Sequence, residues 1–280
     1  MPELPEVETV ARGLRDQLSR ETVKTAFCSG ARVFKTDCTL IPGLLPGETV
    51  RFIGRRGKYL YLDLGPARLV IHLGMSGRLL MDGPRSLPPE RPSQDDPHIH
   101  MSIGFRSGKR LLYRDPRKFG RVLLFPDAGD SAMIFSRLGI EPLGPGFTLQ
   151  AFRRLIKGKR GLIKPFLMSQ EHISGMGNIY ADEALFLAGI HPETPIEYLG
   201  PARIRRLFDS IPLVLKMGIE FGGTTFRDYR NSEGREGRFQ EMLSVYGRDG
   251  LECLKCGRLL KKIQVGGRSS HFCPACQRKG

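Results

Sequence analysis

The chain has 280 residues, of which 40% are hydrophobic, enough for one large or two ordinary domains with buried cores. Lys and Arg number 44 against 29 Asp and Glu, and the formal net charge of +15 favours a polyanionic partner bound through phosphates. No apolar run approaches the roughly 18 residues of a transmembrane helix, and the N-terminus is acidic where a secretory signal is basic. Composition therefore argues against a membrane-spanning or secreted protein, and we expect a soluble cytoplasmic one.

The first part of the chain is expected to combine one helix with a set of strands. After Pro5, apolar residues recur at helical spacing: Val7, Val10, Ala11, Leu14 and Leu18. Residues 49–64, 68–81 and 98–125 then carry short apolar and β-branched runs separated by glycine-containing turns, a pattern typical of a β-sandwich or barrel. The proline-rich stretch 81–97 is expected to be a surface loop. We assign residues 1–128 to this N-terminal domain.

The second part of the chain changes to a helical period. Glycines and prolines punctuate residues 129–147, which we interpret as an interdomain linker. Residues 148–246 read as a mostly helical domain, and 247–280 as a compact hairpin segment, so the predicted fold class is α+β. Two basic runs, with seven basic residues in 105–121 and six in 151–164, are better explained by a nucleic-acid backbone than by solvated faces.

The first eight residues, MPELPEVE, could create a reactive N-terminus. Removal of Met1 would leave Pro2 with a free secondary amine, which can attack an aldehyde-like sugar carbon and form a cationic iminium. Glu3 and Glu6 lie beside it, and the positive end of the following helix dipole disfavours the protonated amine. The alternative is that proline and glutamate simply begin an ordinary helix.

Four cysteines near the C-terminus have the spacing of a zinc site. Cys253 and Cys256 form one C-x2-C pair, Cys273 and Cys276 form another, and 16 residues separate the pairs. Four sulfur ligands leave no open position for a reactive water, so one structural Zn²⁺ is expected. Two disulfides or four unconnected thiols are the alternatives.

The chain resembles the formamidopyrimidine-DNA glycosylase family from end to end. The resemblance rests on motifs in the family's order: MPELPEVET, RRGKYL, HLGMSG, DPRKFG, IKPFLM, GNIYADE, GIHP, GGTT, VYGR and a terminal four-cysteine segment ending FCPACQ. It implies an N-terminal catalytic β-sandwich with a leading α-helix, then a helix-two-turns-helix domain that ends in a zinc-finger β-hairpin.

The resemblance also implies roles for residues that are ambiguous by themselves. Lys58 would contact phosphate near the reaction centre and Lys164 would lie on the lesion side of the pocket, although each could be a plain surface lysine. His72 would hold a backbone phosphate, although a histidine on an apolar strand is usually a core residue. Asn178 would bind the phosphate of the extruded nucleotide or only cap a helix. Arg268 would bind phosphates flanking the lesion, or be merely solvated.

Three further residues would form a wedge in the DNA, namely Met75, Arg117 and Phe119. An enzyme that acts on a base must remove it from the stack, at a cost of a few kcal/mol, and side chains that fill the vacated space offset part of that cost. From their residue types alone they look like ordinary strand-end residues.

The resemblance therefore implies a bifunctional DNA glycosylase and lyase that excises oxidised purines such as 8-oxoguanine through a Pro2 Schiff base. Glu3 would shuttle protons and Glu6 would orient the terminus. The expected partner is double-stranded DNA with oxidised or abasic sites, bound by a monomer. Two alternatives are an endonuclease VIII-type enzyme for oxidised pyrimidines, against which Leu4 argues, and a non-catalytic zinc-finger protein, against which the set of Pro2, Glu3 and Lys58 argues. The loop 222–239 is expected to close over the flipped base.

Overall fold

The computed structural model describes residues 1–82, 96–224 and 236–279. The chain forms two compact units, one made of Met1–Ser136 with Phe221–Arg238 and the other of Arg137–Glu220 with Phe239–Gly280. Most of the two loops expected at 81–97 and 222–239 lies outside the described residues. The boundaries at 128, 147 and 246 stay predictions.

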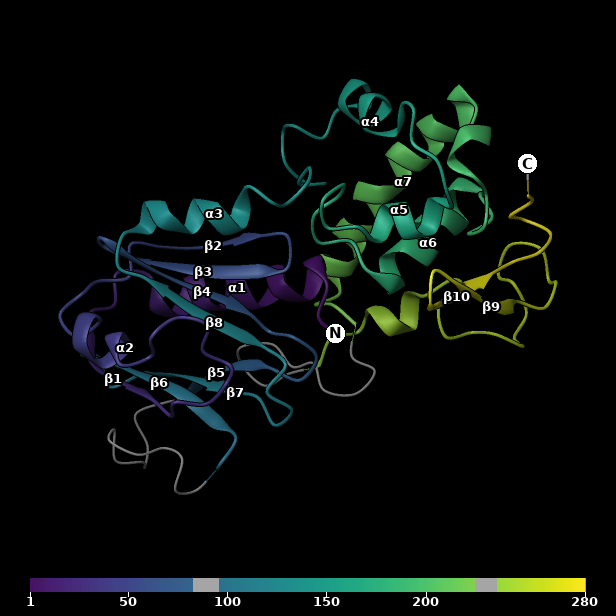
Figure 1. Cartoon of the computed structure of the whole chain (residues 1–280). Coiled ribbons are helices and arrows are strands. Elements are labelled where there is room, and N and C mark those ends of the chain that lie inside the picture. Colours follow the sequence, from purple (N-terminus) through teal and green to yellow (C-terminus); the bar gives the residue numbers. More distant parts are fainter. Residues whose placement is uncertain (83–95, 225–235, 280) are drawn as a thin grey trace. The chain divides into compact units, whose positions relative to one another are not determined.

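Helix α1 opens the first unit and spans Leu4–Leu18 (Figure 1). Glu3 is its N-cap residue, and Glu3 and Glu6 form a reciprocal capping box, which satisfies backbone N–H groups that the first helical turn leaves unpaired. The predicted apolar face is buried in one core together with side chains from the strands that follow. Burial of this face, more than helix propensity, stabilises α1.

Two four-stranded antiparallel sheets form a sandwich around that core (Figure 1). In β3, residues with buried side chains alternate with partly exposed ones, the pattern of a strand that faces a core on one side. The first sheet has the order β1, β6, β7, β5, with the bounds Val23–Cys28, Ile99–Phe105, Arg110–Arg114 and Arg78–Asp82. The second has the order β2, β3, β4, β8, with the bounds Phe52–Arg56, Tyr59–Leu64, Ala67–His72 and Arg121–Phe125.

Short helices complete this unit: α2 at Leu40–Leu44, η2 at Ala128–Ser131 and α3 at Ala132–Phe135. Nearly all of the last two lies within residues 129–147, which the sequence led us to interpret as an interdomain linker. They form because the Asp127 carboxylate accepts the Gly129 N–H at 2.7 Å, and because the Phe135 ring packs 5.6 Å from the Tyr61 ring. The first contact is local, whereas the second depends on the sheet.

The second unit is helical and ends in a β-hairpin, as predicted. Its longer helices are α4 (Leu149–Ile156), α6 (Asn178–Ala188) and α7 (Pro201–Glu220). At Gly218 in α7 a Cβ would lie 2.5 Å from the Tyr180 ring of α6, so only glycine lets these two helices pack so closely. None of the helices in the described ranges is long and apolar enough to span a membrane. The elements are α4 (Leu149–Ile156), α5 (Ile163–Met168), α6 (Asn178–Ala188), η3 (Ile196–Tyr198), α7 (Pro201–Glu220), η4 (Phe239–Met242), β9 (Lys261–Val265) and β10 (Arg268–Phe272).

A buried carboxylate on α6 holds the loop that leads to the hairpin. Glu183 accepts the backbone N–H groups of Ser244, Val245 and Tyr246, each at 2.9 Å. Burial raises the pKa of Glu183, and these three donors oppose that rise. The carboxylate thus replaces the secondary-structure partners that this loop lacks.

Replacement of this carboxylate should destabilise the second unit. We expect Glu183→Ala to lower the free energy of unfolding by roughly 3 kcal/mol, because buried donors without an acceptor are costly. Thermal unfolding and hydrogen exchange of the 244–246 amides measure the effect. Glu197→Ala, at an exposed position of η3, is the control, and equal stability of the two variants would contradict the assignment.

Candidate active site and zinc site

The N-terminus of the first unit is held by a carboxylate. Pro2 and Glu3 are buried, and Glu6, which is 2% exposed, accepts the Glu3 N–H through Oε2 and the Thr224 N–H through Oε1, both at 2.8 Å. Both oxygens of Glu6 are therefore used to fix backbone. Glu6 joins the start of the chain to a residue more than two hundred positions later, directly before a segment outside the described residues.

A second carboxylate ties α1 to the turn that carries Lys58. Glu8 Oε2 pairs with Arg55 Nε at 3.0 Å, and Arg55 also donates to the Gly57 carbonyl at 3.0 Å, directly before Lys58. Burial alone would raise the pKa of Glu8, but the hydrogen bond from Arg12 and the charge of Arg55 outweigh it, and the pKa lies below its usual range. The sequence did not indicate this pair, although Glu8 lies in the motif MPELPEVET and Arg55 in the motif RRGKYL.

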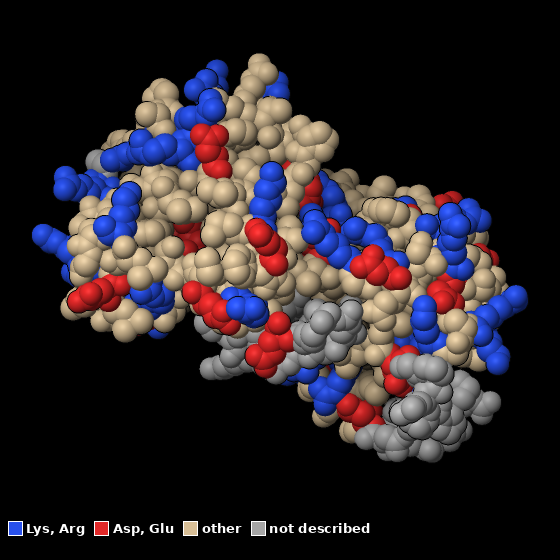
Figure 2. All heavy atoms as spheres, turned by 180° about the vertical axis from the view of Figure 1, so that it is seen from behind, with Lys and Arg blue, Asp and Glu red and all other residues tan. Residues whose placement is uncertain are grey.

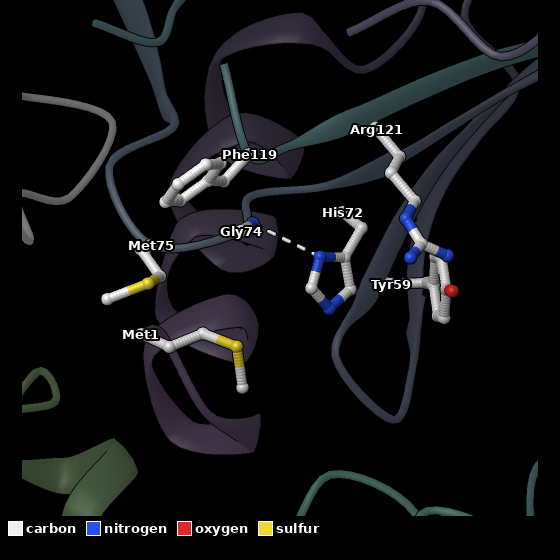
Figure 3. A pocket seen from close by; sticks show the side chains of 7 residues that line it. All are labelled: Met1, Tyr59, His72, Gly74, Met75, Phe119 and Arg121. Atoms are coloured by element: carbon white, nitrogen blue, oxygen red, sulfur yellow. Dashed lines mark hydrogen bonds between the residues drawn. The ribbon is translucent and has the colours of Figure 1, made fainter. Parts of the chain in front are cut away.

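A pocket of about 440 Å³ lies beside the N-terminus in the first unit (Figure 3). Its lining residues are Met1, Tyr59, His72, Gly74, Met75, Phe119 and Arg121. The Met1 side chain extends toward the pocket in Figure 3, and sequence reasoning did not anticipate Tyr59 or Arg121. The aromatic and basic side chains give this pocket the chemistry to hold a sugar and a phosphate.

The His72 ring has a defined tautomer. Its Nδ1 accepts the Gly74 N–H at 3.1 Å, so the proton of the neutral ring lies on Nε2. Burial, followed by the positive charges of Lys58 and Arg121, lowers the pKa of His72 to about 4. His72 is therefore a neutral hydrogen-bond donor at physiological pH, and not simply a core histidine.

The three residues expected in the wedge lie on two adjoining loops. Met75 is 42% exposed and Phe119 is 48% exposed, although both side chains are large and apolar. The exposed Arg117 guanidinium carbon lies 4.8 Å from the centre of the Phe119 ring, a cation–π contact. Apolar and cationic groups are thus presented together to solvent.

In the second unit, Asn178 lies next to the hairpin residue that follows Arg268. Asn178 begins α6, and its Nδ2 donates to Ser269 Oγ at 3.4 Å. Its Oδ1 is buried and has no hydrogen-bond partner among the described residues. Arg268 begins β10 and is exposed. The structure therefore brings together two of the residues that the resemblance relates to phosphates.

The interpretation of Lys58 and Lys164 as plain surface lysines is wrong. Lys58 is 6% exposed and Lys164 is completely buried. Lys164 Nζ pairs with Asp182 Oδ1 at 2.7 Å and donates to the Ser269 carbonyl at 2.6 Å. The other oxygen of Asp182 accepts the His271 backbone N–H at 2.9 Å. This buried pair fastens α5 and α6 to β10, a role that the sequence did not indicate.

Basic side chains are not confined to one patch. On the face shown in Figure 2, Lys and Arg side chains are spread widely, with Asp and Glu side chains among them. Phosphate contacts are therefore expected to depend on individually placed residues as well as on the net charge of +15.

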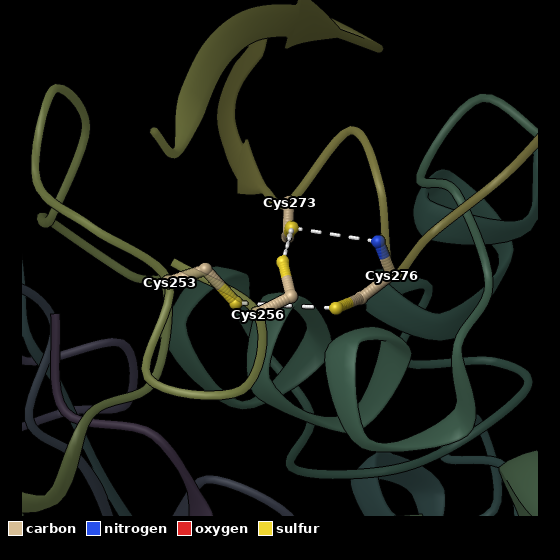
Figure 4. Close-up of side chains that lie close together, drawn as sticks. All are labelled: Cys253, Cys256, Cys273 and Cys276. Atoms are coloured by element: carbon tan, nitrogen blue, oxygen red, sulfur yellow. Dashed lines mark hydrogen bonds between the residues drawn. The ribbon is translucent and has the colours of Figure 1, made fainter. Parts of the chain in front are cut away.

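The four cysteines lie together at the base of the hairpin (Figure 4). Their sulfur atoms all lie within 4.8 Å of one another, with Cys253 and Cys276 4.0 Å apart and Cys256 and Cys273 3.5 Å apart. Four thiolates around Zn²⁺ at about 2.3 Å place their sulfurs about 3.8 Å apart, so the set fits a tetrahedral site. All six cysteines are free, which excludes the disulfide alternative, and Cys28 and Cys38 take no part in this site.

Loss of one cysteine ligand should remove the zinc and leave the first unit largely undisturbed. We expect one zinc per chain, and Cys273→Ser to lose the metal and weaken DNA binding far more than it disturbs the first unit. Elemental analysis and binding to abasic-site DNA measure these effects, with Cys28→Ser as the control. Freshly purified wild type without stoichiometric zinc would refute the assignment.

Comparison with known proteins covers the whole chain. Three family models match: the formamidopyrimidine-DNA glycosylase N-terminal domain at residues 1–122, the H2TH domain of the same enzymes at 138–230, and a zinc finger found in FPG and IleRS at 250–278. A formamidopyrimidine-DNA glycosylase of Streptococcus pyogenes is 42% identical over 280 residues, covering 100% of this chain and 99% of the relative.

Solved structures agree with these matches. The complex of a mutant Lactococcus lactis FPG with Fapy-dG-containing DNA has a TM-score of 0.88 at 36% identity, covering 99% of this chain and 100% of that one. The complex of the Lactococcus lactis Fpg with abasic-site DNA also has a TM-score of 0.88, at 35% identity and the same coverage. Together with the four-cysteine site and the two-unit fold, these matches establish that the chain belongs to the formamidopyrimidine-DNA glycosylase family, enzymes of DNA base excision repair.

Proposed function

We propose that this protein is a bifunctional DNA glycosylase and lyase that excises oxidised purines, 8-oxoguanine and formamidopyrimidines, from double-stranded DNA. The observation that carries the proposal is that Pro2, Glu3 and Glu6, which follow the exposed Met1, are buried beside the pocket that Met1 lines, in a chain of this family. Relatives that were crystallised with Fapy-dG-containing and abasic-site DNA support the substrate class. We further propose that the protein acts as a cytoplasmic monomer.

Pro2 is the proposed nucleophile. In the chain that starts at Met1, the Pro2 nitrogen is an amide, and the Met1 side chain lines the pocket. Removal of Met1 would free a secondary amine at that position. Its lone pair bonds to C1′ of the damaged nucleotide, the glycosidic bond breaks and the base leaves with a proton. Loss of the amine proton and opening of the sugar ring then give an iminium, which acts as the electron sink for elimination of the 3′ and then the 5′ phosphate.

Glu3 and Glu6 have different proposed roles. Glu3, which is 4% exposed, protonates the ring oxygen of the sugar and moves protons between the later steps. Glu6 is a poor proton carrier in this arrangement because both of its oxygens accept backbone N–H groups. It instead fixes the position of the terminus. Lys58, whose turn is tied to α1 through Arg55 and Glu8, offers its ammonium to a nearby phosphate.

The DNA backbone is held by residues from both units in this proposal. His72 donates from Nε2, and Arg268 pairs with a phosphate as a charged donor. Asn178 donates from Nδ2 to a phosphate in place of its long 3.4 Å contact with Ser269 Oγ. Lys164 acts indirectly, because its ammonium is engaged by Asp182 and the hairpin. We infer that it positions the hairpin that carries Arg268.

An endonuclease VIII-type specificity for oxidised pyrimidines is the alternative. Leu4 argues against it, since that branch usually has glycine there, and Leu4 is completely buried in this chain, where a glycine would leave a cavity. The Arg117 and Phe119 pair in the wedge supports the purine branch as well. A non-catalytic DNA-binding protein would not need the buried set of Pro2, Glu3 and Lys58.

The covalent step is tested by borohydride trapping. We expect the protein to be trapped on DNA that carries 8-oxoguanine or an abasic site, with the cross-link on Pro2, because only an iminium is reduced to a stable amine. Pro2→Gly should impair the trapping. Mass mapping identifies the residue, and a cross-link on Lys58 instead of residue 2 would reject the assigned nucleophile.

The wedge arginine should determine which opposite base is preferred. A guanidinium offers only donors, and a cytosine left alone by flipping presents two adjacent acceptors, whereas adenine presents one acceptor next to a donor. A bidentate contact discriminates by about 1–3 kcal/mol, which corresponds to a factor of roughly 5 to 160 in rate. Wild type is expected to cut 8-oxoguanine opposite cytosine much faster than opposite adenine.

Arg117→Leu should narrow that ratio and affect cleavage of a bare abasic site much less. Single-turnover rates on the two 8-oxoguanine duplexes give the ratio, and Arg106→Leu, at an exposed position outside the pocket, is the matched control. An unchanged ratio in Arg117→Leu would mean that another residue reads the opposite base.

A further inference from the structure

We propose that Asp115 is the positioning residue of the wedge: its single buried carboxylate holds together the loop that carries Met75 and the loop that carries Arg117 and Phe119. This inference rests on the proposed function, because it concerns the step in which these side chains enter the DNA. Asp115 itself is completely buried and does not line the pocket.

Asp115 reaches both loops with its two oxygens. Oδ1 accepts the hydroxyl of Ser76, the residue after Met75, at 2.6 Å. Oδ2 accepts the N–H of Gly120, the residue after Phe119, at 2.8 Å. Hydrogen bonds to an ionised acceptor are the stronger kind, and in a buried place they are shielded from competing water. Each wedge loop is thus fastened one residue away from its apolar side chain.

Close backbone packing also prevents the two loops from moving relative to each other. At Gly74, which has a φ of +64°, a Cβ would lie 2.6 Å from the Phe119 carbonyl carbon and from the Gly120 nitrogen. At Gly120, a Cβ would overlap the Tyr113 hydroxyl, 1.8 Å away. The loops therefore touch through backbone, and a change in one is transmitted to the other.

The carboxylate is itself held at the end of the sandwich. Asp115 follows β7 directly, its N–H donates to the His98 carbonyl at 2.9 Å, and its carbonyl oxygen lies 3.0 Å from His100 Nε2. The Tyr113 hydroxyl donates to Oδ2 at 3.2 Å. Burial and the negative charge of Asp115 raise the pKa of Tyr113, so the phenol stays a neutral donor. The wedge loops are thereby anchored to a rigid strand.

This anchoring has a functional consequence for flipping. Met75 and Phe119 are large, apolar and exposed, and on free loops they would move to bury themselves before DNA binds. Fixing them beforehand reduces the ordering cost of entering the base stack. An abasic site has no base to extrude, so a wedge held in place matters less for cleaving it.

The test compares three DNA substrates across four variants. Asp115→Ala removes both anchors, and Ser76→Ala removes only the one on the Met75 loop. Asp115→Asn should keep both loops anchored, because its amide oxygen can accept the Gly120 N–H while its amide nitrogen donates to the Ser76 hydroxyl. Ser131→Ala is the control, since Ser131 is a buried serine of the same unit that hydrogen-bonds Arg68 and the Ala128 carbonyl.

Single-turnover rates are measured on 8-oxoguanine opposite cytosine, on 8-oxoguanine opposite adenine, and on an abasic site. We expect Asp115→Ala and Ser76→Ala to slow lesion excision about tenfold more than abasic-site cleavage and to narrow the opposite-base ratio, while Asp115→Asn and Ser131→Ala stay within about threefold of wild type. If Asp115→Ala does not fold, Ser76→Ala carries the test.

Two results would overturn the role of Asp115. Equal losses on lesion and abasic substrates would mean that the residue only stabilises the fold. Unchanged rates in Ser76→Ala and Asp115→Ala would mean that the loops hold their places without it. Failure of the wild type on every duplex would instead reject the proposed function, so the two failures are distinguishable.

Discussion

Buried carboxylates that accept backbone N–H groups are the interaction on which this structure depends. Glu6 fixes the N-terminus and Thr224, Asp115 joins the two wedge loops, and Glu183 holds the loop before the hairpin. Each of these carboxylates stands where irregular backbone must be held without a strand or helix partner. A charged acceptor can serve two or three donors at once, which a neutral side chain does less well.

The arrangement explains how a small catalytic group can be placed accurately. A chain terminus is normally mobile, yet here residues 2–6 are buried and Glu3 and Glu6 cap α1 reciprocally. The same helix is tied to the turn before Lys58 through Glu8 and Arg55. If Pro2 is the nucleophile, its reach is set by a helix packed into the core of the sandwich, and sites on rigid elements are more accurate than sites on loops.

In the second unit, a metal site and a buried ion pair hold a β-hairpin in place. The described part of its hairpin has only two short strands, which by themselves are marginally stable in water. Four cysteine sulfurs at its base and the buried pair of Lys164 and Asp182 supply the missing constraint. Burying an ion pair is costly, so its value here is geometric: it determines where the exposed Arg268 and its neighbour Ser269 lie relative to Asn178.

The sequence by itself determined the features that local patterns encode. The helical period after Pro5, the short apolar runs in residues 49–64 and the cysteine spacing predicted α1, a strand where β3 lies and the zinc site, because each depends on residues close in the chain. The order of the motifs also identified the family. The individual roles of Pro2, Lys58 and Arg268 stay predictions.

Only the tertiary structure decided which polar groups are buried and what they contact. Nothing local to IKPFLM shows that Lys164 is completely buried, because its partners come from α6 and from a strand about a hundred residues later. Thr224 lies 218 residues from its partner Glu6, and Ser76 lies 39 residues from its partner Asp115. The low pKa of His72, which depends on burial and on the charges of Lys58 and Arg121, and the packing of α3 against Tyr61 also rest on contacts between distant residues. Contacts between distant residues depend on the packing of the whole unit, and residue types and spacing do not encode that packing locally.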